Sequence, residues 1–192
     1  QRTVMDVAAL TPKRPLPLIT DLLTLGADGI ESTHIIFTNI DIGVQKDFYL
    51  ALSDLIENRF GPETPFIVYR RNVSDRYRTA DDLPEIYADP GKLAYGHDCF
   101  VIPVQYVPDL DLGRCCIGAA HFDYLLSMAL DRRSGFKMAR VNDRALTFHI
   151  GNAISWVRQL DHVEFNLGES LKAIERMRRG ASVPPDSVFA TI

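Results

Sequence analysis

The sequence predicts a layered α/β domain, and three observations support this fold class. Its 192 residues are the usual size of one domain. Hydrophobic residues make up 46% of the chain and charged residues 24%, which is enough apolar material for a packed core. Short apolar runs alternate with segments of helical periodicity, and that alternation is typical of α/β layers.

Four short apolar runs predict strands, because they are rich in β-branched and aromatic residues. The first run has no polar alternation, which is typical of a strand buried on both faces. The predicted strands are "HIIF" at 34–37, "FIVYRR" at 66–71, "CFVIPV" at 99–104 and "ALTFHI" at 145–150.

Five segments predict helices. In the second, Phe48, Leu52 and Leu55 share one helical stripe, with Asp47 as N-cap and Gly61 as the end. In the last, Asn166 is the predicted N-cap, with Glu169 as its capping-box partner. The predicted helices start at "LITDLL" (18–23) and continue with 47–61, 122–130, 153–160 and 166–179.

The remaining segments predict loops. Three prolines in residues 11–18 indicate an ordered connection, and residues 72–96 are polar and interrupted by Pro84 and Pro90. We expect one α/β domain over residues 1–183 and a loose C-terminal tail over 184–192.

Charge and cysteine content exclude some classes of protein. The formal net charge of −4 argues against a general nucleic-acid binder. The three cysteines, Cys99, Cys115 and Cys116, lack metal-site spacing and lie in apolar surroundings, so we expect buried thiols in a reducing, cytoplasmic setting. No apolar stretch is long enough for a transmembrane helix.

Polar residues follow the first predicted strand, at Thr38, Asn39 and Asp41. In open α/β sheets, ligands gather beyond the carboxyl ends of strands. A carboxylate there suits Mg²⁺ or Mn²⁺, which take their other ligands from phosphate and water. The alternative is that Asn39 and Asp41 form an Asx turn and cap the next helix.

Two further polar segments flank later strands. His97 and Asp98 precede the third strand, where they could orient a hydroxyl or act as a general base, or simply form an exposed turn. His149, in the fourth strand, could bind a metal or a phosphate, or be a hydrogen-bonded structural residue.

Together, "IIFTNIDIGVQKDFY", "GHDCFVIP" and "LTFHIGN" resemble segments of the nucleotide-diphospho-sugar transferases, the GT-A type of glycosyltransferase. The resemblance spans residues 34–156. It implies a layered α/β/α fold with a mostly parallel mixed sheet. It further implies that the N-terminal part is truncated or reduced, because the acidic motif arrives by residue 41. Either a nucleotide-binding half lies upstream, or a reduced domain binds something else.

The resemblance also implies roles for individual residues. Asp41 would be the metal-binding carboxylate, with Asn39 in place of the usual first aspartate and Thr38 beside it. Asp98 would be the catalytic base. The remaining roles are metal or diphosphate binding for His149, phosphate neutralisation for Arg70 and Arg71, and substrate binding for His97, Asn152 and Trp156, the last by stacking on a sugar ring.

The function implied by the resemblance is transfer of a sugar from a nucleotide-diphosphate donor to a hydroxyl acceptor, with Mn²⁺ or Mg²⁺ as cofactor. Two alternatives stay open. A metal-dependent phosphoesterase would need more ligands than Asn39, Asp41 and His149 provide. A degenerate transferase-like binding or assembly module fits the amide at Asn39. The donor, the acceptor, the stereochemical outcome and the oligomeric state cannot be predicted.

Overall fold

The computed structural model describes residues 1–151, 160–179 and 184. Its contacts divide the chain into two compact units, which we treat separately. The helical unit contains residues 1–35, 103–137 and 154–192, and the sheet unit contains residues 36–102 and 138–153. The single domain expected over residues 1–183 stays a prediction.

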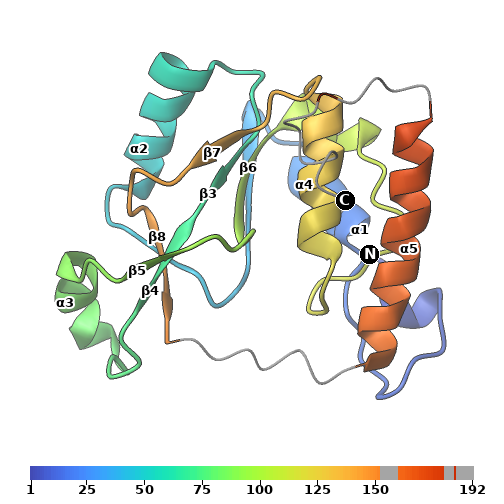
Figure 1. Ribbon diagram of the computed structural model, residues 1–192, viewed down its shortest axis with the longest axis horizontal. Helices are drawn as coiled ribbons and strands as arrows, with labels where there is room; N and C mark the ends of the chain where they lie inside the picture. Colours follow the sequence, from blue (N-terminus) through green and yellow to red (C-terminus); the bar gives the residue numbers. More distant parts are fainter. Residues whose placement is uncertain (152–159, 180–183, 185–192) are drawn as a thin grey trace. The chain divides into compact units, whose positions relative to one another are not determined.

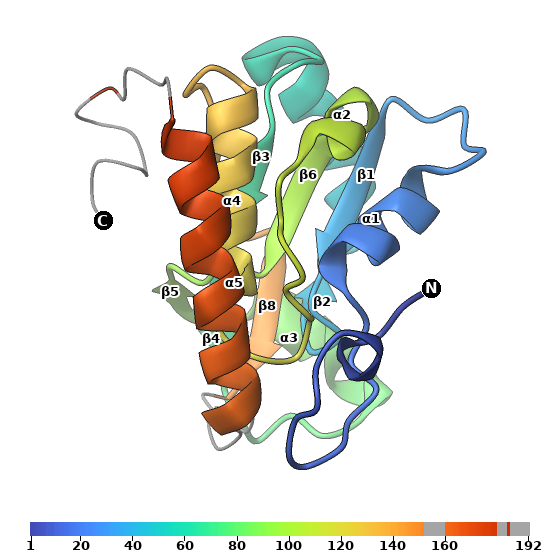
Figure 2. The same ribbon diagram turned by 90° about the vertical axis from the view of Figure 1, so that its right-hand side faces the viewer.

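Three α-helices form the frame of the helical unit. Helices α4 and α5 lie side by side in both ribbon views (Figures 1 and 2). Residues 110–121, which precede α4, form a loop that we call the cysteine loop, and its Cys115 and Cys116 thiols are both buried. The loop contacts α1 through the Ile19 amide and α5 through Asn166. The elements are η1 (Val4–Asp6), α1 (Ile19–Ala27), η4 (Val104–Asp109), α4 (Phe122–Arg133) and α5 (Leu160–Arg178).

Helix α5 starts earlier than the sequence predicted, so Asn166 is not its N-cap. Asn166 is fully buried in mid-helix and binds the cysteine loop instead. Its Oδ1 accepts from the Cys116 amide (3.0 Å), and its Nδ2 donates to the carbonyls of Cys116 (2.8 Å) and Ala120 (3.0 Å). A capping residue and a buried loop-binding residue need the same polar side chain, so the sequence pattern alone did not separate them.

Glu169 fixes the same loop from the next turn of α5. It accepts two side-chain hydrogen bonds from Arg114 (3.0 and 2.9 Å) and one from Lys172 (3.0 Å). The Arg114 hydrogen bonds lower the pKa of Glu169 to about 2. Charge pairing therefore joins α5 to the segment ahead of α4.

The sheet unit contains most of the strands, which form two mixed four-stranded sheets in the orders β1-β6-β3-β7 and β2-β8-β4-β5 (Figure 1). The α/β class is therefore confirmed. The strands are β1 (His34–Thr38), β2 (Gly43–Val44), β3 (Phe66–Val68), β4 (Arg70–Val73), β5 (Lys92–Ala94), β6 (Cys99–Pro103), β7 (Ala139–Val141) and β8 (Thr147–Ile150).

Both sheets mix strand directions. Strand β3 runs antiparallel to β6 and parallel to β7, while β4 runs antiparallel to β5 and parallel to β8. The predicted strand 66–71 is divided at Tyr69, whose amide donates to the carbonyl of Val141 (2.9 Å). The break moves Arg70 and Arg71 into the second sheet.

Helices cover one face of each sheet. Phe48, Leu52 and Leu55 pack with Phe66 and Val68 in one core cluster. The helical stripe predicted for 47–61 is confirmed, although it continues from α2 (Phe48–Asp54) into a π-helical turn (Leu55–Phe60) before Gly61. On the second sheet, η3 (Ala80–Asp82) and α3 (Leu83–Ala88) follow β4, and Ile86 of α3 packs on Phe148 of β8.

Some predictions fall outside the described residues, namely most of the helix expected at 153–160, together with Asn152, Trp156 and tail residues 185–192. Where the structure describes the chain, no helix combines the length and the apolar character of a membrane span.

Candidate functional site

Polar side chains from four segments meet on one face of the second sheet. We call Asn39, Asp41, Arg70, Asp98 and His149 the polar cluster. All five belong to the sheet unit. They come from the loop after β1, from β4, from the residue before β6 and from β8.

Asp98 lies at the centre of the first contact group. Arg70 Nη1 donates to Asp98 Oδ2, and Asn39 Nδ2 donates to Oδ1 (2.9 Å). The Asn39 backbone amide also donates to the Asp98 carbonyl (3.0 Å). Both carboxylate oxygens therefore already accept a hydrogen bond, and the side chain is mostly buried.

Gly96 makes this arrangement possible. A Cβ atom at position 96 would overlap Asp98 Oδ2 and come within 3.2 Å of Arg70 Nη1. Any larger residue at this position would therefore have to displace the Asp98 carboxylate or the Arg70 guanidinium.

The second contact group joins Asp41 to His149. Asp41 Oδ2 lies 3.3 Å from His149 Nε2, and His149 Nδ1 lies 2.9 Å from the carbonyl oxygen of Gly151. Gly151 has a φ of 73°, and β8 ends at the residue before it. A carbonyl oxygen can only accept, so Nδ1 must carry a proton.

That tautomer leaves an unusual contact. A neutral His149 protonated at Nδ1 presents a lone pair at Nε2, facing a carboxylate that also only accepts. The contact is favourable only if the ring gains a second proton or a cation lies between the two groups. Metal-binding histidines commonly donate their other N–H to a backbone carbonyl, as His149 does.

The strand register shows two residues that the sequence analysis missed. Arg70 is paired with Thr147 and Asn72 with His149, so all four side chains share one face. Asn72 Oδ1 accepts from Arg70 Nε (3.1 Å). The Thr147 hydroxyl is buried and lacks a hydrogen-bond partner among the described residues. Period-2 alternation within the two strands was the signal that could have found both.

Arg71 does not join the cluster, so we no longer assign it to phosphate binding. As the strand neighbour of Arg70, it points to the opposite face. Its guanidinium donates to carbonyls at the C-terminal end of α3, including that of Ile86 (2.8 Å), and its burial lowers its pKa. This contact makes Arg71 a cap for α3.

Thr38 and His97 directly precede the cluster residues Asn39 and Asp98 in the sequence. The Thr38 hydroxyl donates to the Asn39 carbonyl (3.0 Å). His97 stacks on Tyr69 with ring centroids 6.2 Å apart, and burial lowers its pKa. The substrate roles of His97, Asn152 and Trp156 stay predictions, and the last two lie outside the described residues.

The turn at Asn39 is a backbone turn and not the Asx turn of the alternative. Ile42 donates its amide to the Asn39 carbonyl (3.2 Å), so a turn is present. Asp47, not Asn39 or Asp41, occupies the N-cap position of α2. Turn formation therefore does not account for the contacts of either side chain.

The polar cluster offers two side chains, Asp41 and His149, as ligands for a divalent cation. Within residues 1–151 and 160–179, no three His, Cys, Asp or Glu side chains converge as a metal site. Asp98 is paired with the cation of Arg70, which leaves Asp41 and His149. Two protein donors fit an ion whose other ligands are phosphate oxygens and water, and the imidazole favours Mn²⁺ over Mg²⁺.

The three cysteines are poor candidates for a catalytic nucleophile or a metal ligand. Burial raises the pKa of Cys99 to about 12 and those of Cys115 and Cys116 to about 11. Thiols in this state are poor nucleophiles and poor ligands.

Comparison of the chain with family models, with curated proteins and with solved structures found no match. The resemblance to GT-A transferases therefore rests on the residues quoted above.

Proposed function

We propose that this protein is a metal-dependent glycosyltransferase of GT-A type, with the polar cluster as its reaction centre. The observation that carries the proposal is the 3.3 Å approach of Asp41 Oδ2 to His149 Nε2, which is favourable only with a second ring proton or with a cation held by both groups. A cation between them would make this contact favourable, and a nucleotide diphosphate would supply the ligands that the protein lacks.

The reaction breaks the anomeric C–O bond of the donor, and negative charge grows on the departing diphosphate. A divalent ion held by Asp41 and His149 would supply electrostatic stabilisation of that charge. Arg70 carries a second positive charge on the same face of the sheet. Removal of one such stabilising group typically costs roughly 3 kcal/mol, or about a hundredfold in rate.

Asp98 is the proposed base for the acceptor hydroxyl. Its carboxylate would take the proton as the hydroxyl oxygen forms the new bond to the anomeric carbon. Both of its oxygens are engaged, by Asn39 and Arg70. A turn of Arg70 from Asp98 toward the diphosphate would free one oxygen and couple donor binding to base release.

A binding module is the second candidate, because one observation favours it. Asp98 is held by an amide and a guanidinium, as in a purely structural ion pair. Asn39, which brings no charge, stands where the resemblance expects a carboxylate. A module of this kind would bind a partner without turnover.

A thermal-shift screen with UDP-, GDP- and CDP-sugars, each with and without Mn²⁺, tests the proposal. We expect a rise in melting temperature that requires both metal and nucleotide, because neither supplies a full ligand set alone. No rise with any donor would contradict the transferase proposal and favour the module.

A matched pair of variants sharpens the screen. His149→Asn should lose the metal-dependent rise. His121→Asn should keep it, since His121 belongs to the helical unit and asparagine tolerates its φ of 77°. Loss in both variants would show that the response does not report on the polar cluster.

A further inference from the structure

An arginine-rich cavity lies in the helical unit, outside the polar cluster. It has a volume of about 430 Å³ and is lined by the C-terminal turns of α4 and α5 and by the segment after η4. We call it the arginine pocket. Its charged lining residues are Asp109, Asp111, Arg132, Arg133, Arg176 and Arg179.

Two of the four arginines are neutralised inside the pocket. Arg133 pairs with Asp109 (2.9 Å). Arg176 donates twice to the carboxylate of Asp111 (2.7 Å each), which lowers the pKa of Asp111. These pairs attach Asp109 and Asp111 to the C-terminal parts of α4 and α5.

The other two arginines, Arg132 and Arg179, form no ion pair with a carboxylate of the described lining. Arg132 donates Nε to the Met177 carbonyl (3.3 Å) and lies over the Phe136 ring, and it forms no ion pair among the described residues. Arg179 pairs only with Glu175, in a contact where both side chains are at least 70% exposed and which is therefore weak. The lining carries a formal net charge of +2.

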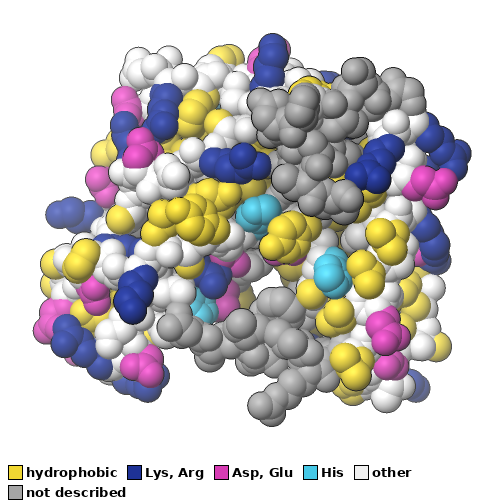
Figure 3. Space-filling model, in the orientation of Figure 1, with side chains coloured by type: hydrophobic (Ala, Val, Ile, Leu, Met, Phe, Trp, Pro, Cys, Tyr) yellow, Lys and Arg dark blue, Asp and Glu magenta, His cyan; other side chains and the backbone are white. Residues whose placement is uncertain are grey.

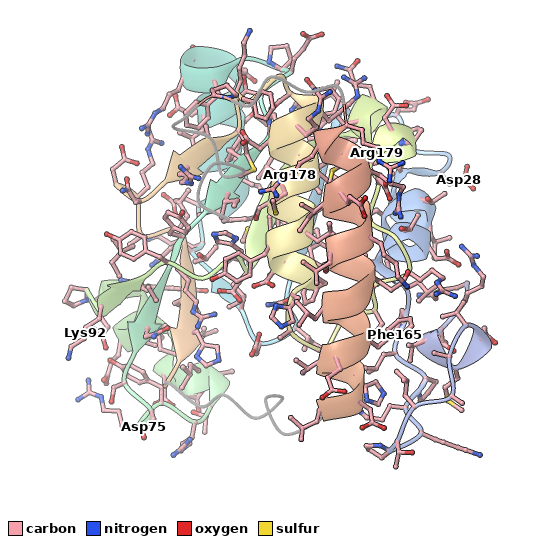
Figure 4. All side chains as sticks on the ribbon, turned by 45° about the vertical axis from the view of Figure 1, so that its right-hand side comes forward. Asp28, Asp75, Lys92, Phe165, Arg178 and Arg179 are labelled. Carbon is pink, nitrogen blue, oxygen red and sulfur yellow. The ribbon has the colours of Figure 1, made fainter. Side chains whose placement is uncertain are left out.

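Figure 3 shows dark-blue side chains with a magenta neighbour near the upper end of α5, and Figure 4 labels Arg179 there. Guanidinium groups match phosphate oxygens in a planar, bidentate geometry. A cavity near the small end of the ligand-pocket range suits a compact group rather than an extended chain.

We propose that the arginine pocket binds a compact phosphorylated ligand with at least two negative charges, of the diphosphate class. Arg132 and Arg179 supply the positive charge that no carboxylate of the lining balances, while Arg133 and Arg176 attach the loop residues Asp109 and Asp111 to the two helices. The proposal is independent of the transferase activity, because it concerns the helical unit and needs no metal.

Calorimetric titration of the full chain with inorganic pyrophosphate in EDTA tests the proposal, since EDTA removes the ions on which the polar cluster depends. We expect saturable binding, weakened at least roughly tenfold in the double variant Arg132→Gln/Arg179→Gln. The control is Lys13→Gln/Lys137→Gln, which removes the same charge from exposed positions of the helical unit and should bind like the wild type.

Hydrogen exchange locates the bound ligand. Pyrophosphate should protect amides in residues 129–133 and 176–179. If the double variant does not fold, Arg179→Gln alone serves, because its side chain is 74% exposed. A parallel arm with phosphatidate vesicles separates a soluble ligand from a lipid headgroup, and vesicle binding without pyrophosphate binding would overturn the proposal. Equal affinity in both double variants, or no saturable binding in EDTA, would also overturn it.

Discussion

Gly96 shows how a single residue supports the polar cluster. Because a Cβ at this position would overlap the Asp98 carboxylate, Gly96→Ala must displace Asp98 or Arg70. We expect a loss of about 1–3 kcal/mol in the free energy of unfolding, measured by urea denaturation.

Gly26→Ala is the control for this substitution. No atom lies within 4 Å of a Cβ at position 26, which is inside α1. Alanine should stabilise that helix by about 0.5–1 kcal/mol. If both alanine variants change stability in the same direction, the close approach at Gly96 does not constrain Asp98.

Asp98→Asn tests the proposed role of Asp98 as the general base. Asparagine keeps the shape and still accepts from Arg70 or Asn39, but it cannot take a proton. We expect turnover to fall about 100-fold or more, while donor affinity measured by calorimetry changes little. Unchanged turnover would remove Asp98 from the chemistry.

At the residue scale, the sequence predicted part of the candidate site. Asn39, Asp41, Asp98 and His149 were selected because each lies at a strand boundary, and each belongs to one of the two contact groups. Thr147 was missed although it lies two residues before His149 in the same strand, so that period-2 alternation places both side chains on one face.

The resemblance implied phosphate neutralisation by both Arg70 and Arg71, at the end of their predicted strand. Successive residues of a strand point to opposite faces, so the two arginines could not serve one ligand together. The general rule was available from the sequence, and its application would have left Arg71 out.

Among the elements, α5 is attached to the cysteine loop by polar contacts of Asn166 and Glu169. Asn166→Ala leaves the Cys116 amide and the facing carbonyls without partners inside the unit. We expect a loss of about 3–5 kcal/mol in the free energy of unfolding, since each buried unpaired group costs roughly 1–3 kcal/mol. Leu167→Ala, at an exposed position of the same helix, should cost less than about 0.5 kcal/mol. Similar losses in both variants would show that Asn166 has no special role.

Elements with a strong apolar period were predictable, as the helical stripe from Phe48 to Phe60 shows. The break at Tyr69 was not, because "FIVYRR" reads as one uninterrupted strand. At this point the chain changes its pairing partner from Val141 of β7 to Thr147 of β8, and both are far away in sequence. Local patterns carry no information about such pairings.

At the scale of the whole molecule, acid should weaken the helical unit through Glu169. Its pKa is about 2 in the folded state, against 4.5 in the unfolded chain. The unfolded chain therefore binds the proton first, and the stabilisation is complete above pH 4.5 and lost as pH falls toward 2. With Arg114 half exposed, the contribution is roughly 2 kcal/mol.

Urea denaturation across this pH range checks the effect. In Glu169→Gln, the free energy of unfolding should fall less than in the wild type as the pH is lowered from 4.5 toward 2. Glu175→Gln, on an exposed side chain of the same helix, should leave this dependence on pH unchanged. If the free energy of unfolding falls equally with pH in Glu169→Gln and the wild type, another group controls the acid sensitivity.

Calorimetric titration of UDP and GDP in the presence of Mn²⁺ tests the central claim most directly. The wild type should bind one of the nucleotides only with the metal, and Asp41→Ala should weaken this binding at least tenfold without loss of fold. Asp81→Ala, which removes an exposed carboxylate of the same unit, should bind like the wild type. Equal affinity in Asp41→Ala and the wild type would contradict the proposed role of the polar cluster.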